Sequence, residues 1–86
     1  MAAPIITDNP LYQLLRDGKV QEFNQRVAAG EQVDLRGCDF RHLTLVGLLA
    51  KGLDFSNSYF RQADLRGIDF TECVSMEGAS IHGAKI

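Results

Sequence analysis

The stretch from Val33 to Ile86 reads, in units of five, VDLRG (33–37), CDFRH (38–42), LTLVG (43–47), LLAKG (48–52), LDFSN (53–57), SYFRQ (58–62), ADLRG (63–67) and IDFTE (68–72), then Cys73, then VSMEG (74–78), ASIHG (79–83) and AKI (84–86). An apolar side chain occupies the third place of every unit. These centres are Leu35, Phe40, Leu45, Ala50, Phe55, Phe60, Leu65, Phe70, Met76, Ile81 and Ile86. A period of five fits neither the period of about 3.6 residues of an amphipathic helix nor the alternation of about two residues of a half-buried strand. The repeat itself therefore predicts the architecture.

Units such as CDFRH at 38–42 and ADLRG at 63–67 open with a small residue, continue with Asp and place Phe or Leu at the centre. In this pattern the chain resembles the pentapeptide-repeat family over residues 33–86. The resemblance implies a mainly β solenoid, a right-handed quadrilateral β-helix in which each unit forms one side and four units form a coil. The repeat region is then expected to contain under three coils.

Coils of twenty residues place each centre over the centre four units later, because a repeat unit buries its apolar face only against its neighbours. We expect Phe40 to stack on Phe60 and then on Ile81. The predicted structural core is Leu35, Phe40, Leu45, Phe55, Phe60, Leu65, Phe70, Met76 and Ile81. Ala50, the one small centre, is expected beside Phe70, so that volume is exchanged within the layer and no void is left.

The residue two places before each centre is also expected to point inward. The family prefers small residues there, and the sequence departs from that preference at Leu43, Leu48 and Leu53. These three leucines are expected to widen or distort the first coils locally. Cys73 is one extra residue at a corner, comparable to a bulge, and the inward register is expected to recover at Val74.

Residues 1–32 lack the repeat. Residues 1–8 are predicted to form a flexible lead. Asn9 followed by Pro10 favours a helix start, and Gly18 favours its end. A second helix is predicted from Lys19 to about Ala29, with Gly30 as the stop. Two short helices need a surface to be stable. We therefore expect residues 9–30 to form a helical cap on the first coil, forming a single structural domain with residues 33–86, although a hairpin that merely precedes the repeats is the alternative.

Composition limits the class of protein. No apolar run approaches the length of a membrane span, and the amino terminus lacks the order of a signal peptide, so no membrane association is expected. The two cysteines, Cys38 and Cys73, lack the spacing of a metal site and are interpreted as packing thiols. These features predict a cytoplasmic protein with no metal and no cofactor.

The charge pattern argues against partners that need a strong field. Residues 33–86 contain seven Asp and Glu against six Lys and Arg, and the preceding part contains four against three. Some members of the family resemble duplex DNA in charge and bind DNA gyrase or topoisomerase IV, which gives a quinolone-protection role as the alternative function. The arginines interrupt the acidic surface that such mimicry needs. A basic patch is also absent, so no nucleic acid partner is expected.

A catalytic site is not indicated. His42 and His82 are about two coils apart, and no nucleophile or carboxylate is fixed beside either one by spacing. No glycine-rich phosphate loop occurs, and no small-molecule substrate is evident. The glycines recur at the corners of the units, where a tight turn favours them. The prediction is a protein that is not an enzyme.

The function predicted from sequence is a non-catalytic interaction or scaffold module whose partner is another protein or a second copy, as a homodimer. Outward apolar residues mark candidate contacts because contiguous exposed apolar area is typical of binding surfaces. The candidates are Val46, Leu49, Tyr59 and Ile86. The helices or a local distortion covering Leu49 is the alternative. For the coil that contains Ile86, the alternatives are continuation in a longer solenoid and coverage by a second copy related by a two-fold axis.

Overall fold

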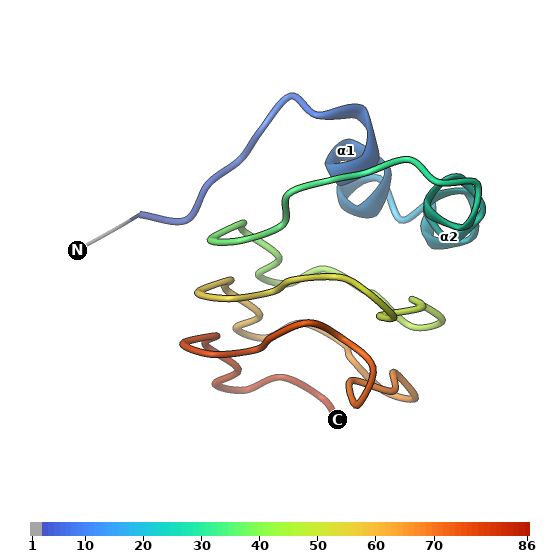
Figure 1. Ribbon diagram of the computed structural model, residues 1–86. Helices are drawn as coiled ribbons and strands as arrows, with labels where there is room; N and C mark the ends of the chain where they lie inside the picture. Colours follow the sequence, from blue (N-terminus) through green and yellow to red (C-terminus); the bar gives the residue numbers. More distant parts are fainter. Residues whose placement is uncertain (1–2) are drawn as a thin grey trace.

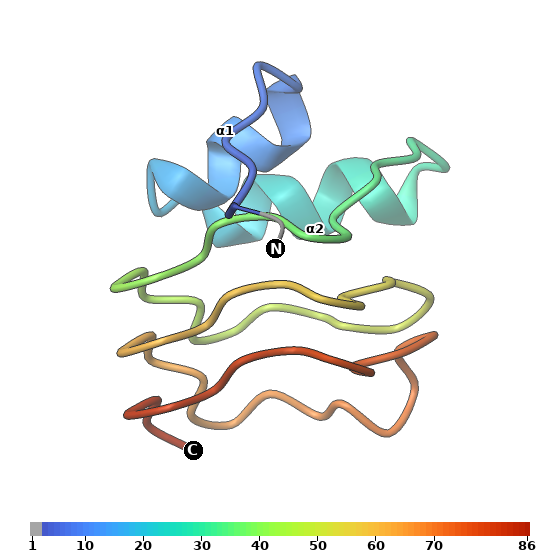
Figure 2. The ribbon, with the colours of Figure 1, turned by 90° about the vertical axis from the view of Figure 1, so that its left-hand side faces the viewer.

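The computed structural model describes residues 3–86 and contains two short helices above a stack of coils (Figures 1 and 2). Helix α1 is Pro10–Arg16 and helix α2 is Val20–Ala28. We divide the repeat region into a first coil (residues 33–52), a second coil (53–72) and a third coil (73–86). The helices lie over the first coil, at what we call the upper end. The third coil lies at the opposite, lower end.

Both helices follow from their sequences. Asn9 caps α1, because its Oδ1 accepts hydrogen bonds from the N–H groups of Leu11 (2.8 Å) and Tyr12 (3.3 Å). The turn between the helices contains Gly18 with a φ of 77°, a conformation that glycine adopts easily. The buried faces consist of Leu11, Tyr12, Leu14, Leu15, Val20, Phe23 and Asn24. The prediction of two N-terminal helices is confirmed.

The coils are joined by backbone pairing between residues about one coil apart. Asp39 forms a parallel bridge with Tyr59, and Tyr59 forms one with Ser80. A second column joins Thr44 to Asp64 and then to Lys85, and a shorter one joins Asp54 to Ser75. Bridged residues are 20 positions apart when both precede Cys73, and 21 positions apart when Cys73 lies between them. Each turn of chain therefore lies directly on the next, as Figure 2 shows.

The predicted fold class is nevertheless wrong. Within residues 3–86 the structure contains two helices and no β-strand, so the mainly β solenoid and the quadrilateral β-helix are not what the chain forms. The pairing consists of isolated bridges. The physical reason is the short unit: a turn interrupts the extended backbone in every five residues, so no two neighbouring residues on one side pair in succession.

The corners are hydrogen-bonded turns. The carbonyl oxygen of Leu35 accepts from the N–H of Cys38 (3.3 Å), and that of Phe55 accepts from Ser58 (3.0 Å). The residue before each donor has a positive φ, 68° at Gly37 and 59° at Asn57, as the third residue of a type II turn requires. Asn57 also lies against Gly78 of the third coil, where a Cβ atom would overlap its side chain.

The core is a ladder of rings and aliphatic side chains inside the coils. The rings of Phe40 and Phe60 stack with centroids 5.0 Å apart, and Phe55 packs edge-on against both. Leu35, Leu45 and Leu65 are buried with them. Phe70 and Met76 are half-buried against this core, and Ile81 is 47% exposed. Ile81 is thus a correction to the predicted core, because among the described residues no layer lies beneath it.

The extra residue in the third coil is Val74, and this corrects the predicted register. Cys73 keeps the inward place, since its N–H closes the turn onto Phe70 O (3.3 Å) and its side chain packs against the core. Val74 donates to Leu53 O (2.7 Å) while Ser75 forms the bridge with Asp54. Two residues therefore oppose one, which is the arrangement of a bulge. The Val74 side chain is turned out and is 66% exposed.

The segment before α1 is attached to the first coil at Ile5. Its N–H donates to Gly37 O (2.9 Å), and its carbonyl oxygen accepts from Asp39 N (2.9 Å). The first coil offers an unpaired backbone edge there, and Ile5 pairs with it. The flexibility of the lead over residues 1–8 stays a prediction. Residues 1–2 of that lead lie outside the described residues. Across residues 3–86, neither helix has the length and apolar character needed to cross a membrane.

Candidate functional site

The upper end of the stack is closed by side chains of the two helices. The hydroxyl of Tyr12 donates to the carbonyl oxygen of Asp39 (2.6 Å), and its ring packs edge-on against Phe40 with centroids 5.6 Å apart. Burial raises the pKa of the Tyr12 hydroxyl, so the group stays a protonated donor at neutral pH. In the lower coils the same carbonyl position accepts from a backbone N–H, as Tyr59 O does from Phe40 (2.8 Å). Tyr12 supplies the donor that a coil above would supply.

Asn24 of α2 makes the second closure, and it explains why Leu49 departs from the repeat. In five units an Asp before the centre accepts the N–H two residues later, as Asp54 does from Ser56 (2.9 Å). Leu49 stands in the Asp position. Its N–H donates to Asn24 Oδ1 (3.0 Å), and Asn24 Nδ2 donates to Gly47 O (2.9 Å). Asn24 of α2 thus supplies the hydrogen-bond acceptor and donor for the backbone of residues 47–49.

The predicted contact residues do not form one patch. Leu49 is 64% exposed and Val46 is 46% exposed, so the helices leave both accessible. Tyr59 is half-buried in the bridges to Asp39 and Ser80, on another side of the coils. Ile86 lies at the lower end. The structure brings together only Val46 and Leu49, which are three residues apart in one coil.

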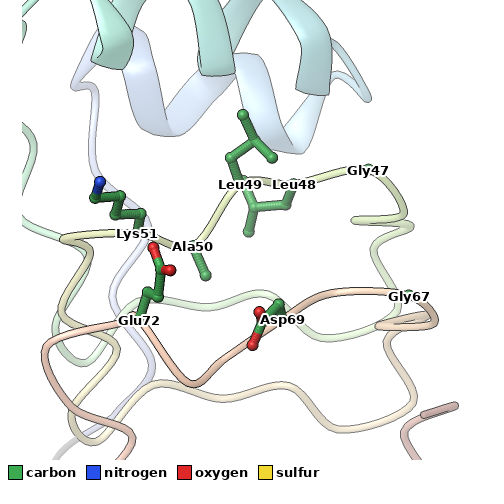
Figure 3. A pocket seen from close by; sticks show the side chains of 8 residues that line it. All are labelled: Gly47, Leu48, Leu49, Ala50, Lys51, Gly67, Asp69 and Glu72. Atoms are coloured by element: carbon green, nitrogen blue, oxygen red, sulfur yellow. The ribbon is translucent and has the colours of Figure 1, made fainter.

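A cleft of about 280 Å³ adjoins Leu49, between the first and second coils (Figure 3). Its upper side is formed by Leu48, Leu49, Ala50 and Lys51, and its lower side carries the Asp69 and Glu72 side chains. Leu48 and Ala50 are buried, and we call these two residues the apolar floor of the cleft. The sequence analysis singled out Leu49 but missed this cleft, because nothing in a single unit shows how far two coils stand apart.

The lower end is apolar and unpaired. Where the layers above are bridged, the N–H of a centre donates to the next coil, as Phe60 does to Ser80 O (2.7 Å). Within residues 3–86, the equivalent N–H groups of Met76, Ile81 and Ile86 have no acceptor. Ile86 is also 78% exposed. This end therefore offers a row of free backbone donors beside apolar side chains.

The comparison with known proteins identifies the repeats. A family model described as Pentapeptide repeats matches residues 38–74 and again residues 51–86, with eight copies, over more than half of the 86 residues. The chain belongs to the pentapeptide-repeat family. No curated protein and no solved structure matches it.

The acidic residues of the pentapeptide repeats have structural roles at the corners. Asp39 accepts from Arg41 N (3.0 Å) and forms an ion pair with the Arg41 guanidinium (2.9 Å), which holds the pKa of the Asp39 carboxyl below its usual value. Asp64 and Arg66 repeat the arrangement on another side of the second coil, with an ion pair of 2.7 Å. These carboxylates are neutralised within their own turns, which favours a structural interpretation over an acidic binding surface.

The two thiols differ in place but neither is arranged as a reactive group. Cys38 is buried, and burial raises the pKa of its thiol to about 11. At neutral pH the thiolate, which is the nucleophilic form, is therefore rare. Cys73 is half-buried against the core, and both thiols are free. Their positions agree with the interpretation of packing residues.

Proposed function

We propose that this pentapeptide-repeat chain is a non-catalytic interaction module that associates with a second copy of itself through the lower end. The observation that carries the proposal is the apolar, unpaired surface formed by the third coil. At the upper end, Phe40 and Leu45 are covered by the helices. In the same columns at the lower end, Ile81 and Ile86 are 47% and 78% exposed. Exposed backbone edges next to apolar side chains promote pairing with another chain.

A second copy is the occupant that the charges favour. The charged residues of the second and third coils are Asp54, Arg61, Asp64, Arg66, Asp69, Glu72, Glu77 and Lys85. Acidic and basic groups are mixed, so two such surfaces facing each other across a two-fold axis do not build up one sign of charge. Apolar surface on both copies would be buried, and the free N–H groups of one copy would pair with carbonyl groups of the other, such as those of Ala79 and Ala84, which accept no hydrogen bond within residues 3–86. We place the module in the cytoplasm as part of the same proposal, because both cysteines are free thiols.

Light scattering coupled to size-exclusion chromatography tests the proposal directly. The wild-type chain is expected to elute with twice the mass of one chain. Ile86→Arg is expected to give a monomer, because it places a charge in the apolar contact, while leaving the far-ultraviolet circular dichroism spectrum unchanged. Gln25→Arg is the matched control, since Gln25 is exposed on α2 and far from this end.

The outcomes separate cleanly. A wild-type chain that stays monomeric at about 100 μM would exclude self-association of ordinary micromolar strength. A dimer that persists in both Ile86→Arg and Ile81→Arg would show that the contact lies elsewhere. Dissociation by Gln25→Arg, with no effect of Ile86→Arg, would move the interface to the helices.

A further inference from the structure

The cleft at Leu49 lies where the backbone pairing between the first and second coils is interrupted. On the neighbouring side, Leu45 N donates to Asp64 O (2.9 Å), and at the next corner Gly52 N donates to Glu72 O (3.0 Å). Between these two points, across residues 47–50 and 66–70, the described backbone contains no inter-coil hydrogen bond. The N–H groups of Ala50 and Asp69 are left without an acceptor beside the cleft.

The interruption has a cause that can be read from the side chains. Where the first two coils are bridged, the inward residue two places before the centre is small in at least one coil, as with Cys38 over Ser58 and Leu43 over Ala63. At the cleft, Leu48 lies over Ile68. Two large side chains in one column hold the coils apart, because a close-packed interior has no spare volume to take them. The opening is therefore built into the core.

A second unbridged stretch gives a useful contrast. Val33 lies over Leu53, again two large residues, and no bridge joins Asp34 to Asp54. The space there adjoins Asp34, Arg36 and Asp54. Asp34 and Arg36 already form an ion pair of 3.0 Å, so the one base at this opening is taken by one of its two acids. The cleft at Leu49 differs because its lining is mainly apolar and its acidic groups are not paired with a base.

The rim of the cleft has an excess of negative charge. Asp69 uses one carboxylate oxygen, Oδ1, to accept from the N–H (2.9 Å) and hydroxyl (2.6 Å) of Thr71. These bonds hold the pKa of Asp69 below its usual value, so the carboxyl is ionised at neutral pH. Within residues 3–86 no ion pair joins Lys51 to Glu72. Two acidic groups thus face one base across an apolar floor (Figure 3).

We propose that this cleft binds an extended segment of another protein that carries an apolar side chain next to a basic one. The apolar side chain enters beside Leu49 and over Ala50. The basic group reaches Asp69 and Glu72, which adds charge complementarity and orientation. A carbonyl group of the segment accepts from the free N–H of Ala50, in the way that Asn24 already accepts from Leu49 on the opposite side of the same chain segment. This site is separate from the lower end.

The probe is the peptide acetyl-Gly-Lys-Leu-Lys-Gly-amide, titrated into ¹⁵N-labelled chain and followed by NMR chemical shifts. Saturable shifts are expected at the amides of Leu49, Ala50 and Asp69, with a Kd on the order of 1 mM for so small a ligand. Two control peptides replace Leu by Ser, or both Lys by Glu. Each is expected to bind at least about tenfold more weakly, because it lacks one of the two features.

Two variants of the chain test the charge. Glu72→Lys is expected to weaken binding about tenfold, since it turns the excess of negative charge into an excess of positive charge. Glu77→Lys is the matched control, because Glu77 is also an exposed glutamate in a turn but does not line the cleft. Equal effects of the two variants would mean that only the overall charge matters, and the assignment of the site would be overturned.

A third variant tests the opening itself. Ile68→Ala is expected to let the coils close, which would slow hydrogen exchange at Ala50 and Asp69 at least about tenfold and abolish peptide binding. Binding that survives closure, or shifts that map to the lower end, would overturn the proposal. The proposal would also be overturned if the wild-type chain showed no saturable shifts at about 5 mM peptide. None of these results depends on whether the chain is a dimer.

Discussion

The two ends of the stack contain the same repeat in very different surroundings. At the upper end, Phe40 is enclosed by Tyr12, Phe55 and Phe60, and Leu45 is buried as well. At the lower end, Ile81 and Ile86 occupy the same columns and are largely exposed. The position within the five-residue unit is identical. What differs is that the helices cover one end, whereas within residues 3–86 no segment covers the other.

This difference teaches that the repeat determines which way the central side chain of a unit points, whereas the neighbouring layers determine how deeply that side chain is buried. A centre points inward wherever it stands in the stack. Only a layer on both sides removes it from water, which is the nearest-neighbour behaviour expected of repeat proteins. Stability should therefore depend on position within the stack, and substitutions at the two ends should show it.

The largest expected effect comes from truncating a centre at each end. Phe40→Ala should lower the free energy of unfolding by about 3–5 kcal/mol, because it removes a fully enclosed ring and leaves a cavity. Ile81→Ala should lower it by less than about 1 kcal/mol in the monomer, since the side chain is already half in water. Chemical denaturation followed by circular dichroism measures both. Equal losses would show that the two ends are not different in the way described.

The closure of the upper end can be removed at Asn24. Asn24→Ala should destabilise the chain by about 2 kcal/mol, because Leu49 N and Gly47 O both lose their partner. Gln25→Ala, at the exposed neighbouring residue of α2, should change stability by less than about 0.5 kcal/mol. Hydrogen exchange at the Leu49 amide provides a local readout. An Asn24→Ala chain with an unchanged midpoint and a protected Leu49 amide would contradict the closure.

A pair of corner glycines compares crowded and open turns. Gly78→Ala in the third coil combines a φ of 75° with overlap onto the Asn57 side chain. Gly67→Ala has a φ of 79° and no atom within 4 Å, so only backbone strain applies. We expect the free energy of unfolding to fall by about 1 kcal/mol in Gly67→Ala and by about 2 kcal/mol in Gly78→Ala, as measured by thermal unfolding. In an Asn57→Ala background, Gly78→Ala should cost only about 1 kcal/mol, as Gly67→Ala does; a cost that stays at about 2 kcal/mol would refute the contact.

The smallest effect is the response to acid. The Arg41 guanidinium holds the Asp39 pKa below its unfolded value of about 3.9, so this stabilisation is complete above that value and is lost as pH falls through the folded pKa. Asp39→Asn should therefore reduce the loss of stability between about pH 5 and pH 2, by roughly 1 kcal/mol. Asp69→Asn, at an exposed corner near the lower end, should reduce it less. Thermal midpoints at stepped pH values measure both, and equal changes would remove the distinction.

Much of the fold was predictable because its signals are local or strictly periodic. Asn9, Pro10 and Gly18 act on the backbone within a few residues, so the first helix was foreseen. The spacing of twenty residues was enough to place Phe40 on Phe60. The fold class was wrong because a family consensus carries no information on whether short paired segments extend into strands. The register error at Val74 arose because either Cys73 or Val74 can be the extra residue, and only their contacts decide.

The candidate site was less accessible from sequence. Leu49 stood out because it replaces an Asp, and its exposure was left open. The partner of its N–H, Asn24, could not be identified, since an Asn on a short helix gives no sign that it replaces a missing coil. The cleft depends on Leu48 lying over Ile68, twenty residues apart. That pairing was available in the sequence, but its effect on the coil spacing required the structure.

The covering of one end by α1 and α2 gives the molecule a direction of growth. Tyr12 and Asn24 supply the hydrogen-bond partners that the upper edge of the first coil needs, so a further layer of this kind has room only at the lower end. Loss of material from the third coil then shortens the structure by one step at a time. Loss of the helices leaves the carbonyl groups of Asp39 and Gly47 and the N–H of Leu49 without these partners.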